Sequence, residues 1–427
     1  MRVPRGRARI RLGAPALRAR RPRALRLGAA LVVTLAGVLA ACGSSEEAAP
    51  LRIGLLLSLG DEPSTVDIAQ QQIVYLAAEH VNEGGGVFGR PVELVVGDTF
   101  SPAGAVEEAR RLVEDEGVHA LFGPGFSADA LTVIAEVAAP LGIPVVSSSA
   151  TSPLLTAAAD GDFFFRTVLS DIAQGPVLAR LTSDLGYSSV GVIYRDDAWG
   201  RGLSEAFLDA WDGDATAVAV DAGESSYLVA LEESMQDEPD ALVLLTFPPE
   251  GRVIMGEALD AGLFERFVFG GGVKDPDFVT EVGIEQLAGT YGVASGHQRG
   301  TASAIAWQET AAAANGEVAD LIYLRESYDA VIAIALAAQA ADSTHGAAIR
   351  DQLRAVTDAP GETVIAGPAG IARALAVLAG GGEIDYDGAS GPLGWDGNGD
   401  LRRGTVGIWR IAADGAIEDV EMVPYPN

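Results

Sequence analysis

The stretch IPVVSSSATSP, residues 143–153, ends an apolar run in a cluster of small hydroxyl-bearing residues. Its first four residues have the composition of a buried strand. Pro153 suits the first turn of a following helical segment, with Ser152 as its cap. Backbone N–H groups left free at such a strand-to-helix corner can bind an anion. The corner is therefore a candidate anion site, which the rest of the chain has to support.

Apolar runs of strand length alternate with amphipathic segments of helix length on both sides of this corner. The expected strands include 51–59, 91–98, 189–197 and 241–247, and the expected helices include 68–81, 102–116, 171–185 and 200–211. Such alternation is typical of an α/β fold in which parallel sheets are covered by helices. Because the pattern restarts after Arg166 and Thr167, two similar α/β lobes are predicted.

The N-terminal region has the composition of an export signal. Residues 1–26 contain ten arginines and no acidic residue, and the 15 residues from Leu27 to Ala41 carry no charge. Since roughly 20 apolar residues are needed to cross a bilayer, a signal peptide over 1–41 is predicted rather than a membrane helix. Residues 42–50 read as a short tether.

Acidic residues dominate the charge of the chain, with 59 against 29 basic residues and a net charge of −30. Loss of 1–41 removes ten of the basic residues, so the remainder carries 19 against 59, or −40. A surface this acidic repels phosphate backbones and anionic lipids, which argues against nucleic-acid binding and polybasic membrane docking. The length that remains suits two domains.

No catalytic, cofactor or metal motif is apparent. Lys274, the only lysine, lies outside any phosphate-binding loop, and the serines at 147–149 lack the flanking pattern of a hydrolase nucleophile. The four histidines are scattered, and the loop at 396–400 departs from a calcium loop at Leu401 and Gly407. We therefore expect no enzyme activity, no cofactor and no metal. A secreted hydrolase would need a nucleophile–base pair that the sequence does not offer.

Polar residues gather where two of the expected strands end. FGPGFSADA (122–130) places Ser127 at the start of a helix, and Ser149, Ala150 and Thr151 belong to the corner described above. Open α/β sheets bind ligands at the carboxyl ends of their strands. Two helix N-termini and two hydroxyls meeting there would hold a carboxylate. The alternative is that Ser127 and Thr151 only cap their own helices.

An ordered series of motifs resembles the leucine/isoleucine/valine-type receptors of the periplasmic-binding-protein-like family, the solute-binding components of ABC importers. The motifs include VNEGGGVFGRPVELVVGD (81–98), GVHALFGPGFSADA (117–130), GIPVVSSSATSPLLT (142–156), FFRTVLSDIAQG (164–175), VGVIYRDDAWGRG (190–202) and IDYDGASGPLGWDGNGD (384–400). The resemblance runs from about Leu51 to the C-terminus. It implies two Rossmann-like lobes joined by three hinge crossovers. Lobe 1 would comprise 51–168 with 297–400, and lobe 2 would comprise 169–296 with 401–427.

The resemblance also implies roles for individual residues. Ser127 matches the serine that contacts the ligand carboxylate, and Ser149 to Thr151 match a segment that adds backbone and hydroxyl contacts. Trp199 lies where the family usually has a tyrosine that covers the ligand. Phe247 is near another aromatic site position, and Tyr323 is a candidate wall residue. Ordinary core packing is the alternative for both Trp199 and Phe247.

One departure from the family concerns the ligand. Amino-acid-binding members place an acidic residue after a late strand of lobe 2 to receive the ammonium group, whereas this chain has glycines at 270–272. An unpaired buried ammonium is costly, so either another group replaces the acid or the solute lacks an amine. Asp275 could serve only after a local shift.

Small residues before Cys42, the only cysteine, resemble the lipobox of bacterial lipoproteins and imply that this cysteine is acylated. The expected protein is a monomeric, lipid-anchored, extracytoplasmic receptor that closes on a small carboxylate-bearing solute and delivers it to an ABC permease. The alternative is a lipoprotein regulator that uses the same fold for protein–protein contacts.

Overall fold

The computed structural model describes residues 49–60, 63–99, 102–315 and 321–426. The predicted signal peptide, Cys42 and most of the predicted tether lie outside these residues. Among the helices within them, none is both long enough and apolar enough to span a membrane.

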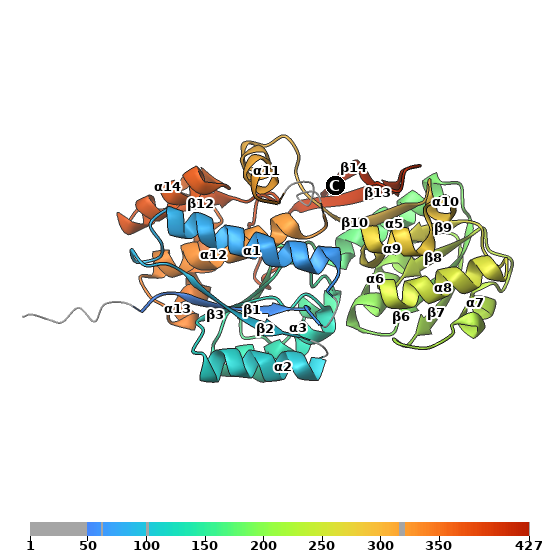
Figure 1. Ribbon diagram of the computed structural model, residues 1–427, viewed down its shortest axis with the longest axis horizontal. Coiled ribbons are helices and arrows are strands. Elements are labelled where there is room, and N and C mark those ends of the chain that lie inside the picture. The colour runs from blue at the N-terminus through green and yellow to red at the C-terminus, as the bar shows by residue number, and fades with distance from the viewer. Residues whose placement is uncertain (1–48, 61–62, 100–101, 316–320, 427) are drawn as a thin grey trace, which may run out of the picture. The chain divides into compact units, whose positions relative to one another are not determined.

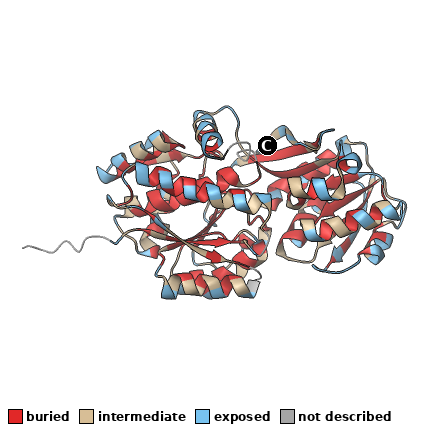
Figure 2. Ribbon diagram, in the orientation of Figure 1, coloured by how far each residue is buried: buried red, intermediate tan, exposed pale blue. Residues whose placement is uncertain are grey.

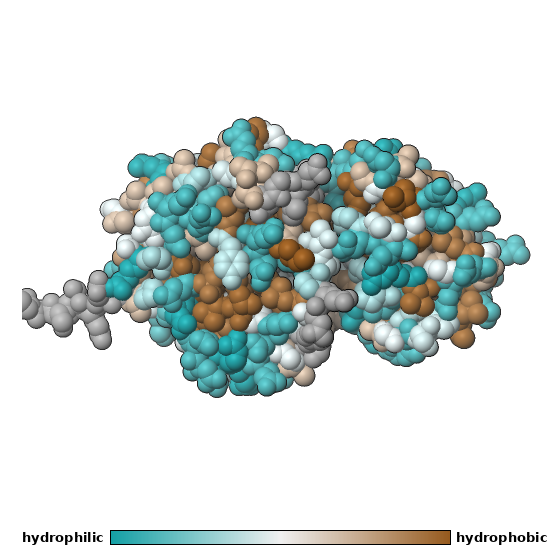
Figure 3. Space-filling model, viewed as in Figure 1, coloured by the Kyte–Doolittle hydropathy of each residue, from teal (hydrophilic) through white to brown (hydrophobic). Residues whose placement is uncertain are grey.

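The first lobe is built on a parallel sheet with the strand order β2-β1-β3-β4-β5. Its strands are β1 (Arg52–Leu57), β2 (Glu93–Asp98), β3 (Ala120–Phe122), β4 (Val145–Ser147) and β5 (Phe164–Arg166). The edge strand β2 keeps Leu94, Val95 and Val96 only partly buried, and apolar surface is visible between α1 and α2 in Figure 3. Strand β4 ends at Ser147, so the hydroxyl-rich corner lies at the carboxyl end of the sheet.

Helices cover both faces of this sheet (Figure 1). One face carries α1 (Thr65–Glu83), α11 (Ala302–Asn315), α12 (Leu324–Ala341), α13 (Gly346–Val356) and α14 (Pro368–Ala379), with a small parallel sheet of β11 (Glu362–Ile365) and β12 (Ile384–Asp387). The other face carries α2 (Pro102–Arg110), α3 (Ser127–Val133) and α4 (Ala139–Leu141), with π-helical turns at Arg111–Asp115 and Ile134–Ala138. Helix α12 is buried from Leu324 to Ala338, because its many alanines let neighbouring elements approach closely (Figure 2).

The second lobe is built on a mixed sheet with the order β14-β13-β10-β9-β8-β6-β7. Its strands are β6 (Ser189–Arg195), β7 (Asp214–Val220), β8 (Ala241–Leu245), β9 (Phe267–Phe269), β10 (Tyr291–Gly296), β13 (Gly404–Ile411) and β14 (Ile417–Tyr425). Helices α5 (Asp171–Asp184) and α6 (Ala198–Ala210) pack on one face. Helices α7 (Leu228–Ser234), α8 (Pro248–Asp260), α9 (Pro276–Val282) and α10 (Ile284–Leu287) pack on the other.

The α/β architecture and the parallel core of both sheets confirm the prediction. The second sheet differs from it at one edge, where β13 and β14 are antiparallel to their neighbours. A tight turn closed by the Ala412 N–H donating to the Ala416 carbonyl at 2.8 Å joins these two strands, and such a turn can connect only antiparallel strands. The lobe boundaries given above stay a prediction.

The chain passes between the two sheets after β5, after β10 and after β12 within the described residues. The buried Arg166 ties the first of these passages to the third. Its Nε donates to Asp400 Oδ1 at 2.6 Å, and its Nη1 donates to the carbonyls of Ala150 at 3.2 Å and Ser152 at 3.0 Å. The Trp395 indole N–H donates to the Arg166 carbonyl at 2.7 Å. One guanidinium therefore joins segments that are more than 200 residues apart in the sequence.

We expect Arg166→Met to lower the free energy of unfolding by about 3–5 kcal/mol, because it leaves the Asp400 carboxylate and two carbonyls without their donor. Urea unfolding measures the effect. Arg180→Met is the matched control, since the ion pairs of Arg180 with Asp184 and Glu421 are exposed and it should cost less than about 1 kcal/mol. Equal losses for the two variants would contradict the role given to Arg166.

Candidate functional site

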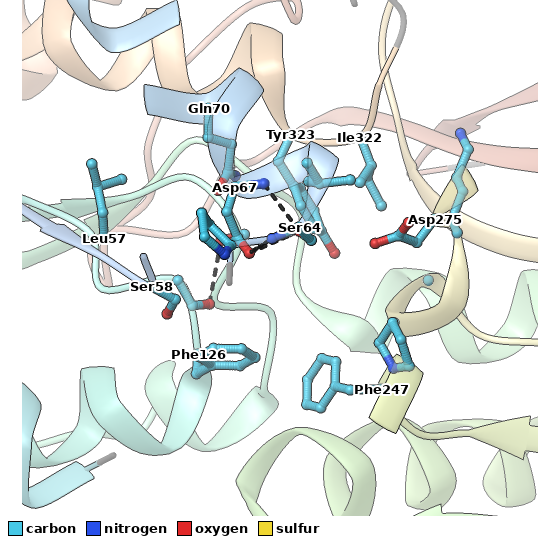
Figure 4. Close-up of a pocket in the computed structure, with 18 of the residues that line it drawn as sticks. Leu57, Ser58, Ser64, Asp67, Gln70, Phe126, Phe247, Asp275, Ile322 and Tyr323 are labelled. Carbon is cyan, nitrogen blue, oxygen red and sulfur yellow. Dashed lines mark hydrogen bonds between the residues drawn. The ribbon is translucent and has the colours of Figure 1, made fainter. Parts of the chain in front are cut away.

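A cavity of about 530 Å³ lies where the carboxyl ends of the first sheet meet loops of the second lobe. The first lobe contributes Ser58, Phe126, Ser127, Ser148 and Ser149, together with Asp67 and Gln70 of helix α1 and its N-cap Ser64. The second lobe contributes Arg195, Trp199, Phe247, Gly271, Gly272, Lys274 and Asp275, and Ile322 and Tyr323 lie just before α12. Figure 4 shows many of these side chains around the cavity.

Two of the predicted serines line the first-lobe wall. Ser127 is 3% exposed, and its hydroxyl accepts the Ser152 N–H at 3.1 Å. The Ser149 hydroxyl donates to the Gly125 carbonyl at 3.3 Å. Ser127 does not cap α3, because Phe126 is the N-cap and no side chain accepts a hydrogen bond there. Ser152 does cap the 3₁₀ turn that begins at Pro153, as the sequence predicted.

Ala150 and Thr151 are fully buried and do not line the cavity. The Ala150 carbonyl accepts from Arg166, and the Thr151 carbonyl accepts the Asp171 N–H at 2.9 Å. Both residues therefore face the interior of the protein. The ligand contacts predicted for Ala150 and Thr151 therefore stay a prediction, whereas Ser127, Ser148 and Ser149 line the cavity.

Aromatic side chains form the wall opposite the serines. Trp199 stacks on Phe247 with 4.6 Å between ring centroids and 29° between the ring planes. Phe126 of the first lobe meets Phe247 edge to face at 5.0 Å (Figure 4). Asp197 caps α6 by accepting the N–H groups of Trp199 at 2.9 Å and Gly200 at 2.8 Å, which positions the tryptophan at the start of the helix. Trp199, Phe247 and Tyr323 thus all lie at the cavity.

The lobes also touch each other directly at the rim of the cavity. The Thr65 N–H, in the first turn of α1, donates to Asp277 Oδ2 of α9 at 3.1 Å. The Ser152 hydroxyl donates to the Ala198 carbonyl at the start of α6 at 2.6 Å. These contacts, together with the Phe126–Phe247 pair, hold the two walls of the cavity against each other.

A steric constraint explains why position 272 is a glycine. A Cβ atom added there would lie 2.5 Å from the Thr246 carbonyl oxygen, 2.7 Å from the Trp199 ring and 3.1 Å from the Phe247 ring. The stacked aromatic pair therefore occupies the space that an acidic side chain at this position would need. The two large aromatic side chains therefore explain why no acidic side chain occurs at position 272.

Several residues of the cavity were not anticipated from the sequence, in particular Phe126, Asp67 and Gln70. Ser64 and Asp67 form a capping box at the start of α1, a pattern that is readable in the sequence as Ser-x-x-Asp. That pattern predicts the start of a helix, but no neighbouring residue in the sequence indicates that this start lies at the cavity. In the described part of the chain, no group of three or more potential metal ligands occurs.

Buried acids lie behind the cavity, at the passages between the lobes. Glu326 accepts from the Ser295 hydroxyl at 3.2 Å, and its carbonyl accepts from Thr167 at 2.8 Å. Burial raises the pKa of Asp171 to about 7, although the Thr151 hydroxyl and the charge of Arg166 oppose the shift. Burial likewise raises the pKa of Glu326 to about 7. Both carboxyls therefore lose their protons near neutral pH in the folded protein.

We expect the free energy of unfolding to fall as the pH rises from about 4 to about 7, because the folded state keeps protons that the unfolded chain releases. Asp171→Asn should flatten part of this dependence, since the amide keeps the shape and removes the titration. Urea unfolding at pH values across the window measures the slope. Asp209→Asn, an exposed residue near the end of α6, is the control and should leave the slope unchanged. A slope for Asp171→Asn equal to that of the wild type would contradict the assignment.

Gly272→Ala should destabilise the protein by about 1–3 kcal/mol, because its methyl group would displace the Trp199–Phe247 stack. Gly256→Ala is the matched control. Gly256 lies inside α8 with no atom within 4 Å of the added Cβ, so alanine there should stabilise by about 0.5–1 kcal/mol. Urea unfolding of both variants gives the comparison, and a neutral Gly272→Ala would show that the aromatic pair does not exclude a side chain.

Comparison with known proteins agrees with the fold. The profile of the periplasmic binding protein family matches residues 50–378. The chemotactic signal transduction system substrate-binding protein BasB of Halobacterium salinarum is 26% identical over 352 residues, which cover 80% of this chain and 82% of BasB.

Two solved structures share the fold. The leucine binding protein LivK of Thermotoga maritima has a TM-score of 0.73 at 22% identity, covering 87% of this chain and 98% of LivK. The branched-chain amino acid transporter substrate binding protein LivJ of Streptococcus pneumoniae, in complex with isoleucine, has a TM-score of 0.71 at 22% identity, covering 88% of this chain and all of LivJ. The chain folds into two α/β lobes around a shared cavity, and the family model matches most of it. This chain belongs to the periplasmic binding protein family.

Proposed function

We propose that the protein is the extracytoplasmic solute-binding component of an ABC importer, and that it captures a small carboxylate-bearing solute by hinge closure. The observation that carries the proposal is the cavity whose walls come from both lobes, with hydroxyls on one side and stacked aromatics on the other. A solute bound between two lobes gains its full contacts only when the lobes meet, so binding favours the closed state. The permease then recognises that state.

The serine wall is the carboxylate end of the proposed site. Ser127 and Ser149 line the cavity, and the Ser127 hydroxyl, which accepts the Ser152 N–H, keeps its own hydrogen to donate to an anion. LivJ, which has a similar fold, was crystallised in complex with isoleucine. The aromatic wall of Trp199, Phe247 and Phe126 would contact the apolar part of the solute.

The proposed protein is a monomer with the lobe boundaries predicted from the sequence, anchored through a lipid on Cys42. The anchor rests on the sequence pattern before that cysteine. A regulator that acts only through protein contacts would not need a cavity of about 530 Å³ between its lobes. The cavity therefore favours the receptor over the regulator.

A thermal-shift screen with amino acids, short carboxylates and their amides should find a compound that raises the melting temperature, because a ligand that binds only the folded state stabilises it. Trp199→Ala and Ser127→Ala should each weaken binding of that compound at least tenfold by titration calorimetry. Trp211→Ala is the matched control. Trp211 lies at the other end of α6, on Phe207, and its loss should leave the affinity unchanged.

A screen without any shift would contradict the receptor function. Unchanged affinity in both Trp199→Ala and Ser127→Ala would instead move the binding site away from this cavity.

A further inference from the structure

Three buried acids lie beside the passages between the two lobes. Asp171 begins α5 directly after the first passage, and Glu326 and Asp329 lie in the first two turns of α12. Each of them is at most 4% exposed. The hydrogen bonds that these acids receive differ, and the difference determines which of them can carry a negative charge without water.

Asp329 has donors for both of its carboxylate oxygens. Oδ1 accepts the Tyr386 hydroxyl at 2.7 Å and the Ala389 N–H at 2.8 Å, and Oδ2 accepts the N–H and the hydroxyl of Ser390 at 2.8 and 2.7 Å. Hydrogen bonds of this kind favour the ionised form of a buried carboxyl, although burial still raises the pKa of Asp329 to about 6. All of these donors lie in or just after β12 of the first lobe, so the bonds do not depend on the position of the second lobe.

Asp171 lacks donors of this kind. Its Oδ1 accepts the Gln174 amide at 2.9 Å, while Oδ2 is buried and makes no hydrogen bond with any described residue. The Thr151 hydroxyl of the first lobe lies beside this carboxyl, and it is also buried without a hydrogen bond in the described part of the chain. The nearby Arg166 already donates to a carboxylate, a hydroxyl and two carbonyls. An ionised Asp171 would therefore be a poorly compensated buried charge, whereas a protonated Asp171 can donate from Oδ2 to Thr151.

Glu326 makes its contact across the second passage. Its Oε1 accepts the hydroxyl of Ser295, at the end of β10 in the second lobe, at 3.2 Å. The Glu326 carbonyl accepts the hydroxyl of Thr167, in the first passage, at 2.8 Å. The carboxyl group of Glu326 thus meets a neutral hydroxyl of the opposite lobe rather than a cation.

Both of these acids change their charge near neutral pH. Burial raises the pKa of Asp171 and that of Glu326 to about 7. The charge of Arg166 lowers the pKa of Asp171, while for Glu326 the charge of Asp329 raises the pKa and that of Arg325 lowers it. Below neutral pH, both acids are therefore protonated while the lobes are in contact.

Two other titratable side chains of this region stay neutral. Burial raises the pKa of Tyr323, just before α12, and the charges of Asp171 and Glu326 raise it further. Burial lowers the pKa of His297, in the second passage, to about 3, and the charge of Arg325 lowers it as well. Neither side chain changes its charge between about pH 5 and about pH 8, so the response of this region to pH comes from its buried acids.

Separation of the lobes would part both contacts, that of Asp171 with Thr151 and that of Glu326 with Ser295. Water would then hydrate the two carboxyls and return their pKa values toward about 4. The closed arrangement therefore binds protons that an open arrangement releases. By linkage, low pH favours closure, and this advantage is lost as the pH rises through about 7.

We propose that Asp171 and Glu326 form a proton-linked hinge, in which protonation of the two acids favours the closed arrangement of the lobes. The proposal rests on the hinge closure of the proposed function and adds its regulation by the pH of the surroundings. Closure at low pH raises the fraction of the protein that holds a solute, and ionisation of the two acids at higher pH favours release.

The decisive experiment measures the distance between the lobes without any added solute. Spin labels are placed on Gln72→Cys of α1 and Asp260→Cys of α8, both exposed, in the full chain with Cys42→Ser, and refolding from urea removes any bound solute. Double electron–electron resonance then gives the ratio of the longer to the shorter distance between about pH 6 and about pH 8. We expect this ratio to rise at least tenfold. About 0.5 M sodium chloride screens the repulsion between surface charges beyond about 4 Å.

Variants of the two acids test the residues themselves. In Asp171→Asn with Glu326→Gln, both amides imitate the protonated acids, so the ratio should stay within twofold of its low-pH value throughout. Asp171→Asn alone, which should lose part of the pH dependence, is the second variant if the double substitution disturbs folding. Asp209→Asn removes an exposed carboxylate of α6 and should follow the wild type within twofold.

A wild-type ratio that stays within twofold across the pH range would overturn the proposal, and so would acid variants that follow the wild type. These outcomes are separate from those of the receptor function. If the thermal-shift screen finds a ligand and the ratio does not change with pH, the hinge proposal fails and the receptor function stands. If the ratio changes with pH and no compound binds, the receptor function fails and the proton-linked hinge stands.

Discussion

The buried guanidinium of Arg166 is the interaction on which the arrangement of the site depends. A cation without solvent has to find acceptors for its N–H groups, and Arg166 finds them in Asp400 and in the carbonyls of Ala150 and Ser152. Collecting these carbonyls turns the hydroxyl-rich corner so that Ala150 faces inward. The same contacts tie the first passage between the lobes to the third. One side chain therefore joins the corner beside the cavity to the passages between the lobes.

A steric constraint determines the chemistry of the opposite wall. The Trp199–Phe247 stack lies beside Gly272, so this part of the wall is apolar and has no room for an acidic side chain at that position. Negative charge enters the cavity instead at helix starts, through Asp67 in the first turn of α1 and Asp275 at the cap of α9. Each of these acids accepts a hydrogen bond at the start of its helix and also lines the cavity.

Much of the fold could be predicted, because strand and helix periodicities are local properties of the chain. The strand expected over 189–197 is β6, and the helix expected over 171–185 is α5 with nearly the same ends. The antiparallel β13–β14 edge was not predicted, since the direction of a strand depends on its partner. For the site, Ser127, Ser149, Trp199, Phe247 and Tyr323 were placed by motif and do line the cavity. Ala150 and Thr151 share the motif but point inward, because Arg166 and Asp171 bind their carbonyls.

The sequence by itself determined the α/β class, the two lobes, the acidic charge and the family, because these follow from composition, periodicity and motif order. Only the tertiary structure decided which polar side chains line the same cavity. Asp67 and Asp275 are more than 200 residues apart, and no local pattern relates them. Their place on the wall of one cavity, and the exclusion of a side chain at 272 by Trp199, arise from how the two sheets bring distant loops together. Distances and steric exclusion of this kind exist only in the folded chain.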